Sequence, residues 1–136
     1  MAFEITEQFR RHVENDTLIM LTTVTPSGRP APRPVWFLWD GSEFVVYSQP
    51  DTAKLRHIAA NPNVTLSTNI GAGGGDTVVV AGIARIVPDA QSAAEMEKYV
   101  ARYGEAMGRV SGSIDRFAAS YSVPILISPT KLWAVP

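Results

Sequence analysis

The chain contains no cysteine. This absence excludes disulfide bonds, thiolate metal sites and a cysteine nucleophile, and it is typical of proteins that work in a reducing compartment. No apolar run approaches the roughly 20 residues that a membrane-spanning helix needs, and the acidic N-terminus lacks the apolar core of a signal peptide. By elimination, the sequence predicts a cytoplasmic protein.

Charge of either sign is also scarce. Charged residues make up 18% of the chain and the net charge is -1, whereas an average protein has about 25% charged residues. No overall field attracts nucleic acid or a membrane surface, so we expect the chain to bind neither. The low charge, together with three Trp, four Tyr and five Phe residues, predicts extra apolar surface for a partner chain or a flat ligand.

Residue patterns for hydrolytic or metal chemistry are missing. The only two histidines, His12 and His57, fall in polar helix contexts without a metal-ligand spacing partner, so zinc and haem sites are weakly supported. Ser111 and Ser113 lie beside glycines but form no G-x-S-x-G elbow. The carboxylates form no close sequence pair of the glycosidase kind. We therefore predict no metal site and assign no catalytic side chain.

The apolar pattern predicts short strands with helices between some of them. At 136 residues the chain has the size of one domain, and we treat residues 1–136 as a single domain. Helices are expected at residues 4–14, 52–60, 92–106 and 113–121. Strands are expected at residues 17–24, 33–39, 43–48, 64–68 and 77–87, followed by an extended pair, 124–127 and 132–135, interrupted at Pro129. About six strands with hairpin links favour a small antiparallel barrel of α+β class over a parallel doubly wound sheet.

Three local signals refine these elements. Gly82 inside a strand predicts a β-bulge or a close backbone approach. The segment Ser92–Glu95 has the form of a capping box, and Met96, Val100 and Tyr103 are expected to line one face of the helix that it opens. The Gly71–Gly75 cluster precedes a strand rather than a helix, so a flexible hairpin loop is favoured over a phosphate loop.

The most informative stretch joins two aromatic-rich strands to the start of a helix. The first part is Arg33, Pro34, Val35, Trp36 and Phe37, and the second is Tyr47, Ser48 and Gln49 followed by Thr52, Ala53 and Lys54. Hydroxyl donors, a cation and the free N–H groups of a helix start suit a phosphate. An arginine can bind phosphate through two hydrogen bonds, and the apolar strand offers a wall for a flat ring. If both parts bind one molecule, that ligand is a phosphorylated, flavin-like cofactor.

Plainer interpretations of the same residues stay open. Asp51 or Thr52 can be an ordinary N-cap followed by a solvated Lys54, and Arg33 can be a surface cation on the sheet.

At these residues the chain resembles the pyridoxamine 5′-phosphate oxidase-like split-barrel family, whose members bind FMN or the deazaflavin coenzyme F-420. The resemblance covers nearly the whole chain. It rests on an ordered set of segments: Thr17–Val24, Ser27–Pro30, Pro34–Phe37, Asp40-Gly41, Tyr47-Ser48, Lys54 and Asn61–Val64. It implies a mainly β, α+β fold: a split β-barrel of about six antiparallel strands in Greek-key order with short peripheral helices. It also implies a homodimer with two cofactor sites at the subunit interface.

The resemblance assigns roles to the candidate residues. In FMN-binding members an arginine and the strand residues after it hold the phosphate and line the ring, and these positions match Arg33, Val35 and Trp36. The family's Tyr-Thr-Asn segment matches Tyr47, Ser48 and Gln49, and its Ser-Arg-Lys phosphate turn matches Thr52, Ala53 and Lys54. Ala53 thus stands where a basic residue is expected, which weakens the case for tight binding of the FMN phosphate.

Other features are more similar to the F-420-dependent branch. The chain lacks the C-terminal Arg-x-His element that holds pyridoxal phosphate in the true oxidases, so pyridoxamine phosphate is not the expected substrate. The resemblance implies an F-420-dependent oxidoreductase that transfers a hydride between the reduced cofactor and a small unsaturated or quinone-like molecule. An FMN-binding oxidoreductase and a non-enzymatic cofactor-binding protein remain as alternatives. Asn69, Trp133 and the Gly71–Gly75 loop are candidates for contacts between subunits.

Overall fold

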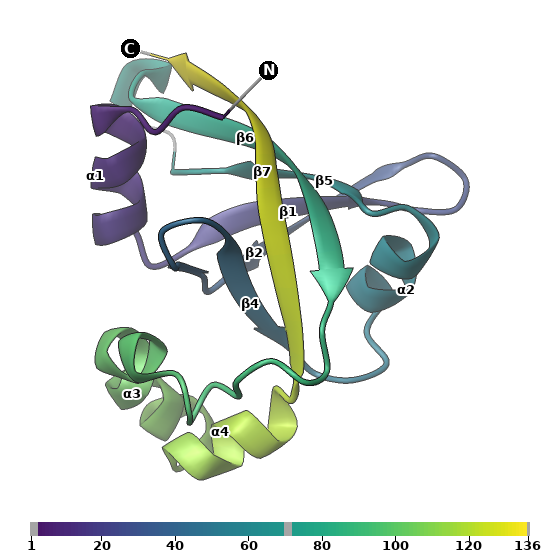
Figure 1. Ribbon diagram of the computed structural model, residues 1–136, viewed down its shortest axis with the longest axis vertical. Helices are drawn as coiled ribbons and strands as arrows, with labels where there is room; N and C mark the ends of the chain where they lie inside the picture. Colours follow the sequence, from purple (N-terminus) through teal and green to yellow (C-terminus); the bar gives the residue numbers. More distant parts are fainter. Residues whose placement is uncertain (1–2, 70–71, 136) are drawn as a thin grey trace.

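A computed structural model describes residues 3–69 and 72–135 of the chain. The described residues form one antiparallel sheet of seven strands that curls into an open half-barrel, with four α-helices around it (Figure 1). Along the sheet the strand order is β2-β1-β5-β6-β7-β4-β3. The predicted α+β split-barrel fold is confirmed. No helix in the described part of the chain has the length and apolar character needed to cross a membrane.

The elements follow the predicted order with shifted ends. The strands are β1 (Ile19–Val24), β2 (Pro30–Val35), β3 (Leu38–Trp39), β4 (Phe44–Ser48), β5 (Asn63–Ser67), β6 (Thr77–Ile86) and β7 (Val123–Val135). The helices are α1 (Glu7–Asn15), α2 (Ala53–Ala60), α3 (Glu97–Ser111) and α4 (Ile114–Ser120), and a short 3-10 turn (η1) spans Ala72–Gly74. The Gly71–Gly75 cluster lies partly outside the described residues.

Strand β4 separates two apolar cores, because it is buried on both faces. Its Phe44 and Val46 pack inside the barrel with residues of β1, β5, β6 and β7. Its Val45 and Tyr47 point the other way and pack against α3 and α4. The helical pair is inserted between β6 and β7 and lies next to β4 in Figure 1. The second core therefore joins this pair to the barrel.

The predicted strand 33–39 is two strands, β2 and β3, separated by Trp36 and Phe37. The side chain of Tyr103 on α3 explains the break. Its hydroxyl accepts a hydrogen bond from the Phe37 N–H (3.0 Å) and lies 2.6 Å from the Phe37 carbonyl oxygen. The backbone of Phe37 is thus bound to a helix instead of a neighbouring strand, and the chain turns a corner there.

The predicted interruption at Pro129 is wrong, because β7 runs unbroken through 13 residues. A register shift between Ala81 and Gly82 of β6, where Gly82 pairs with Pro129, accommodates the proline that cannot donate to the ladder. The expectation for Gly82 is confirmed. A Cβ atom there would lie 2.8 Å from Cγ2 of Ile127 and 2.9 Å from the carbonyl oxygen of Ser128.

Helix α3 begins later than predicted. The Ser92–Glu95 capping-box hydrogen bonds form, at 2.9 and 3.2 Å, but they close a turn, and the helix starts at Glu97. Its buried residues are Tyr99, Tyr103 and Met107. Met96 and Val100, which were predicted to share the buried face with Tyr103, are only partly buried. The helix thus presents a tyrosine-rich face to β4 and to the corner at Trp36.

Candidate functional site

Two adjoining cavities lie where β2, α2 and the α3–α4 pair meet. The polar chamber, of about 260 Å³, is lined by Thr23, Ala31, Arg33, Thr52, Ala53 and His57. The aromatic chamber, of about 350 Å³, is lined by Leu18, Trp36, Tyr47, Tyr99, Val110, Phe117 and Tyr121. Pro34, Val35 and Lys54 line both chambers. The start of α2 and the tryptophan-bearing segment therefore border two neighbouring cavities that share three lining residues.

The first turn of α2 has no side-chain cap. Thr52 occupies the N-cap position, but its hydroxyl makes no capping hydrogen bond and lies 3.0 Å from the Ser48 hydroxyl. Ser48 in turn donates to the Gln49 carbonyl (2.8 Å). Thr52 is therefore the N-cap residue, as predicted, but its side chain does not cap the helix. The first-turn N–H groups and the positive end of the helix dipole are left without a side-chain acceptor, as an anion site requires.

Two cations meet in the polar chamber without an anion between them. Lys54 is half-buried and makes no hydrogen bond or ion pair with any described residue. Burial, and then the neighbouring charge of Arg33, lowers the pKa of the Lys54 ammonium. Arg33 donates only to the carbonyl of the adjacent Pro32 (2.9 Å), and no carboxylate lines this chamber. The chamber is electrostatically complementary to a bound anion.

The structure divides the sequence-predicted residues between the chambers. The majority line one chamber or both: Arg33, Pro34, Val35, Trp36, Tyr47, Thr52, Ala53 and Lys54. Three predicted residues line neither: Phe37, Ser48 and Gln49. Phe37 and Ser48 are fully buried and support the walls, whereas Gln49 is exposed and donates to the Ser120 hydroxyl (3.2 Å).

The aromatic chamber is built around a column of stacked rings. Trp36 stacks on Tyr103, with ring centroids 5.0 Å apart and planes within 8°, and on Phe117 at 5.2 Å and 18°. Phe117 stacks in turn on Tyr121 at 4.3 Å. Offset stacking of this kind fixes ring orientation and contributes about 0.5–1.5 kcal/mol per pair. The chamber thus has rigid, flat walls that suit a planar ligand.

The sequence did not single out Tyr99, Phe117 and Tyr121 as site residues. They come from α3, from α4 and from the residue directly after α4, more than 60 positions beyond the Trp36 corner. The only local signal was the four-residue spacing of Tyr99 and Tyr103 on a predicted helix, which marks a buried face without saying what it packs against.

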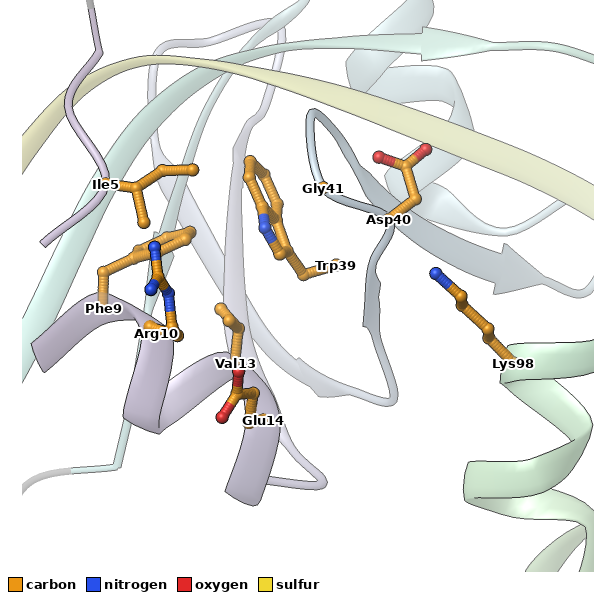
Figure 2. Close-up of a pocket in the computed structure, with 9 residues that line it drawn as sticks. All are labelled: Ile5, Phe9, Arg10, Val13, Glu14, Trp39, Asp40, Gly41 and Lys98. Atoms are coloured by element: carbon orange, nitrogen blue, oxygen red, sulfur yellow. The ribbon is translucent and has the colours of Figure 1, made fainter. Parts of the chain in front are cut away.

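A third cavity, of about 340 Å³, lies between α1, the β3–β4 hairpin and α3 and contains no predicted site residue. Figure 2 shows its apolar side chains, including Phe9, Val13 and Trp39, and Lys98 extending from α3 toward Asp40. Arg10 and Glu14 complete its charged rim with Lys98 and Asp40. The two positive and two negative side chains cancel in net charge, so this cavity favours neither an anionic nor a cationic ligand.

The two histidines have different surroundings. His12 was expected in a polar context but is buried, with Nδ1 2.7 Å from Oδ2 of Asp16 and Nε2 2.9 Å from the Asp76 carbonyl oxygen. It links α1 to the segment before β6. His57 borders the polar chamber, with Nδ1 2.8 Å from the Thr23 hydroxyl. Within the described residues no three His, Asp or Glu side chains gather in a way that could hold a metal ion.

A comparison with protein families identifies the fold's relatives. The model of the family described as pyridoxamine 5′-phosphate oxidase matches residues 5–124, most of the chain. The chain belongs to this family. It is 40% identical over 63 residues to a pyridoxine/pyridoxamine 5′-phosphate oxidase from Bacteroides thetaiotaomicron. That alignment covers 45% of this chain and only 29% of the relative, so the chain spans less than a third of that protein's length.

Solved structures share the fold of this family member. An F420 reductase superposes with a TM-score of 0.69 and 24% identity, over 95% of this chain and 98% of that one. A heme storage protein from Vibrio cholerae superposes with a TM-score of 0.66 and 14% identity, over 98% and 96% of the two chains. At these low sequence identities the structural similarity establishes the fold alone. The ligand has to be inferred from the residues of the site.

Proposed function

We propose that this chain is an oxidoreductase that binds coenzyme F-420 and transfers a hydride between the reduced cofactor and a small unsaturated or quinone-like molecule. One observation carries the proposal. An anion-complementary chamber lies next to a chamber with flat aromatic walls, and Pro34, Val35 and Lys54 border both. A cofactor with a phosphate at one end and a planar ring at the other fits this pairing. The membership in the pyridoxamine 5′-phosphate oxidase family supports the same class of ligand.

The phosphate belongs in the polar chamber. The Lys54 ammonium, the Thr52 hydroxyl and the uncapped N–H groups at the start of α2 are the donors for its oxygens, with Arg33 assisting. A bound anion replaces the solvation that Lys54 loses on burial and offsets its repulsion from Arg33. It therefore raises the pKa of Lys54 back toward its ordinary value.

The ring belongs against Val35 and Trp36. A bound deazaflavin or flavin supplies the hydride chemistry itself. The residues of the chain bind and orient the ring, cover one face of it and keep water away from the other. This division of labour explains why the sequence carries no nucleophile or general base that stands out.

F-420 is favoured over FMN by the charge of the polar chamber. A phosphate monoester carries about two negative charges at neutral pH, whereas the phosphodiester of F-420 carries one. Ala53 contributes no cation where the family pattern has a basic residue, so the local charge suits the diester better. Arg29 and Arg56 are candidates for the acidic tail of F-420, and Arg56 already donates to the Asp51 carbonyl at the edge of this region. The alternatives are an FMN-binding oxidoreductase and a non-enzymatic carrier.

We further propose that two copies of the chain pair through the outer face of the sheet and complete the site. A row of cross-strand neighbours on this face consists of Met20, Ser67, Val79 and Trp133, without a charge. Met20 is 38% exposed and Trp133 45% exposed. An uncharged row with large exposed apolar side chains is typical of a subunit interface. The Lys131 ammonium lies beside this row, 4.7 Å from the centre of the Trp133 ring.

Titration of the purified protein with F-420 and with FMN, each followed by fluorescence, tests the cofactor directly. Lys54→Ala removes a charge-assisted hydrogen bond worth roughly 1.5–3 kcal/mol, so the affinity should fall about 10- to 100-fold. Stability should be unchanged within about 0.5 kcal/mol. Lys98→Ala, in the third cavity, is the matched control and should bind the cofactor as the wild type does.

Equal cofactor affinity of folded Lys54→Ala and wild-type protein would end the proposed role of this lysine. Tighter binding of FMN than of F-420 would favour the FMN alternative. Turnover of the reduced cofactor with candidate unsaturated or quinone acceptors then separates an enzyme from a carrier.

A further inference from the structure

Tyr99 has an unusual position in the aromatic chamber. It is only 1% exposed, and it packs edge-to-face on Tyr47 with ring centroids 4.8 Å apart. Its hydroxyl makes no hydrogen bond with any described residue. Among the described residues, Nη2 of Arg102 is the one side-chain nitrogen or oxygen atom that is fully buried and has no hydrogen-bond partner. The Tyr99 oxygen also has no partner, but it is not fully buried. The Tyr99 hydroxyl therefore keeps a small accessible area, and the Tyr99 side chain lines the aromatic chamber.

The neighbouring tyrosines show that an unpaired hydroxyl is not the rule here. Tyr47 donates to the Gln91 carbonyl (2.8 Å). The Tyr103 hydroxyl accepts a hydrogen bond from the Phe37 N–H and lies 2.9 Å from the Thr17 carbonyl oxygen. Tyr121 is partly exposed and can bind water. A buried hydroxyl without a partner costs free energy, so its partner is expected to be a ligand.

We propose that the Tyr99 hydroxyl donates a hydrogen bond to a carbonyl oxygen of a planar substrate held in the aromatic chamber. The inference rests on the proposed function, because it places the substrate in the part of this chamber that α3 and α4 form, next to a cofactor ring that lies against Val35 and Trp36. It makes Tyr99 a specificity-determining residue that selects carbonyl-bearing planar molecules over hydrocarbons of the same shape.

The chemistry of the chamber fixes the direction of this hydrogen bond. Burial raises the pKa of Tyr99 well above the ordinary value of a phenol, so the group stays protonated at neutral pH and can donate. No carboxylate, amide or aliphatic hydroxyl side chain lines the chamber. The polar side chains that line it are Tyr99, Tyr121, Lys54 and Tyr47. Tyr47 has already donated its proton to Gln91, and the other three offer donors. A ligand with an acceptor matches these donors, and an uncharged carbonyl does so without bringing an unpaired charge into an apolar space.

The test compares two probes and two proteins. Equilibrium dialysis measures the binding of 1,4-naphthoquinone and of naphthalene, which has the same ring shape without the oxygens, to the wild type and to Tyr99→Phe. The wild type should prefer the quinone. Loss of one neutral hydrogen bond should weaken quinone binding about 3- to 10-fold and leave naphthalene binding unchanged. The absence of cysteine removes the thiol that would otherwise react with the quinone.

Two controls make the outcome specific. Lys98→Ala changes a residue of the third cavity, outside both chambers, so the ratio of quinone to naphthalene affinity should stay as in the wild type. Titration of Tyr99→Phe with F-420 should give the wild-type affinity, because the phosphate and the ring contact other residues.

An equal change for both probes, no change for either, or failure of both to bind the wild type would overturn the proposal. The result is distinguishable from failure of the proposed function. If the wild type binds neither F-420 nor FMN, that function is wrong, while a quinone preference that depends on Tyr99 still supports the hydrogen bond.

Discussion

Tyr103 is the side chain on which the shape of the site depends most. Its hydroxyl accepts from the buried Phe37 N–H (3.0 Å) and from Nε of Arg102 (3.2 Å). It donates its single proton to the carbonyl of Phe37 (2.6 Å) or of Thr17 (2.9 Å). These bonds hold the Trp36 corner between β2 and β3. Tyr103→Phe deletes them while it keeps the ring that stacks on Trp36.

The magnitude follows from the donors that lose their acceptor. A buried donor left without a partner costs about 1–3 kcal/mol, and a charged donor costs more. The Phe37 N–H and the Arg102 guanidinium are both affected, and Nη2 of Arg102 already has no partner. Since such terms are not additive, we expect Tyr103→Phe to lower the free energy of unfolding by about 2–4 kcal/mol. The urea midpoint should fall by roughly 1–2 M with an unchanged slope.

Tyr99→Phe is the matched comparison, because it removes a tyrosine hydroxyl from the same helix face that binds no described residue. Its free energy of unfolding should stay within about 0.5 kcal/mol of the wild type. Both variants are unfolded in urea and followed by tryptophan fluorescence and circular dichroism. If Tyr103→Phe is no less stable than Tyr99→Phe, the hydroxyl does not hold the corner, and the break between β2 and β3 needs another cause.

Two further predictions concern stability against pH and assembly. Burial by itself lowers the pKa of His12, but the hydrogen bonds and charges of Asp16 and Asp76 outweigh it and raise this pKa above the ordinary 6.5. The stabilisation by His12 is therefore complete below about pH 6.5 and is lost as the pH rises through the folded-state pKa. Urea unfolding between about pH 6 and about pH 8 should show the wild type losing stability relative to His12→Gln, and parallel curves would contradict this. For assembly, Trp133→Glu should convert a dimer to a monomer in light scattering at micromolar concentration. Ile5→Glu, a substitution at a similarly exposed apolar side chain, should leave the mass unchanged, and equal masses of all three proteins would refute an interface at Trp133.

The parts of the fold that the sequence predicted well are those whose cause is local. The β-branched, apolar composition of residues 17–24 predicted β1, and Asn61-Pro62 follows the last residue of α2. The wrong predictions concern places whose structure depends on residues far away in the sequence. The corner at Trp36 depends on Tyr103, which lies 66 positions beyond its Phe37 partner. The continuity of β7 at Pro129 depends on its pairing with β6, whose register shifts between Ala81 and Gly82.

The same distinction holds for the site. The polar chamber is lined by residues between Thr23 and Lys54, together with His57, so their order in one stretch of the chain was enough to predict that several of them lie together. The aromatic chamber also needs α3 and α4. A tyrosine on a helix face gives no sign of whether its hydroxyl meets a backbone carbonyl, as in Tyr103, or stays unpaired beside a cavity, as in Tyr99. That difference arises only when the helical pair packs on β4.

The two cores separated by β4 have a consequence for how the site can change. Thr52 and Arg33 border only the polar chamber, which the barrel and α2 form, whereas Phe117 and Tyr121 border only the aromatic chamber. Substitutions in α3 and α4 therefore alter the walls around a planar ligand without touching the proposed phosphate donors. Lys54 borders both chambers, so its substitution changes the lining of both. Under the proposed function, choice of substrate can diverge through the helical pair while cofactor binding is kept by the barrel.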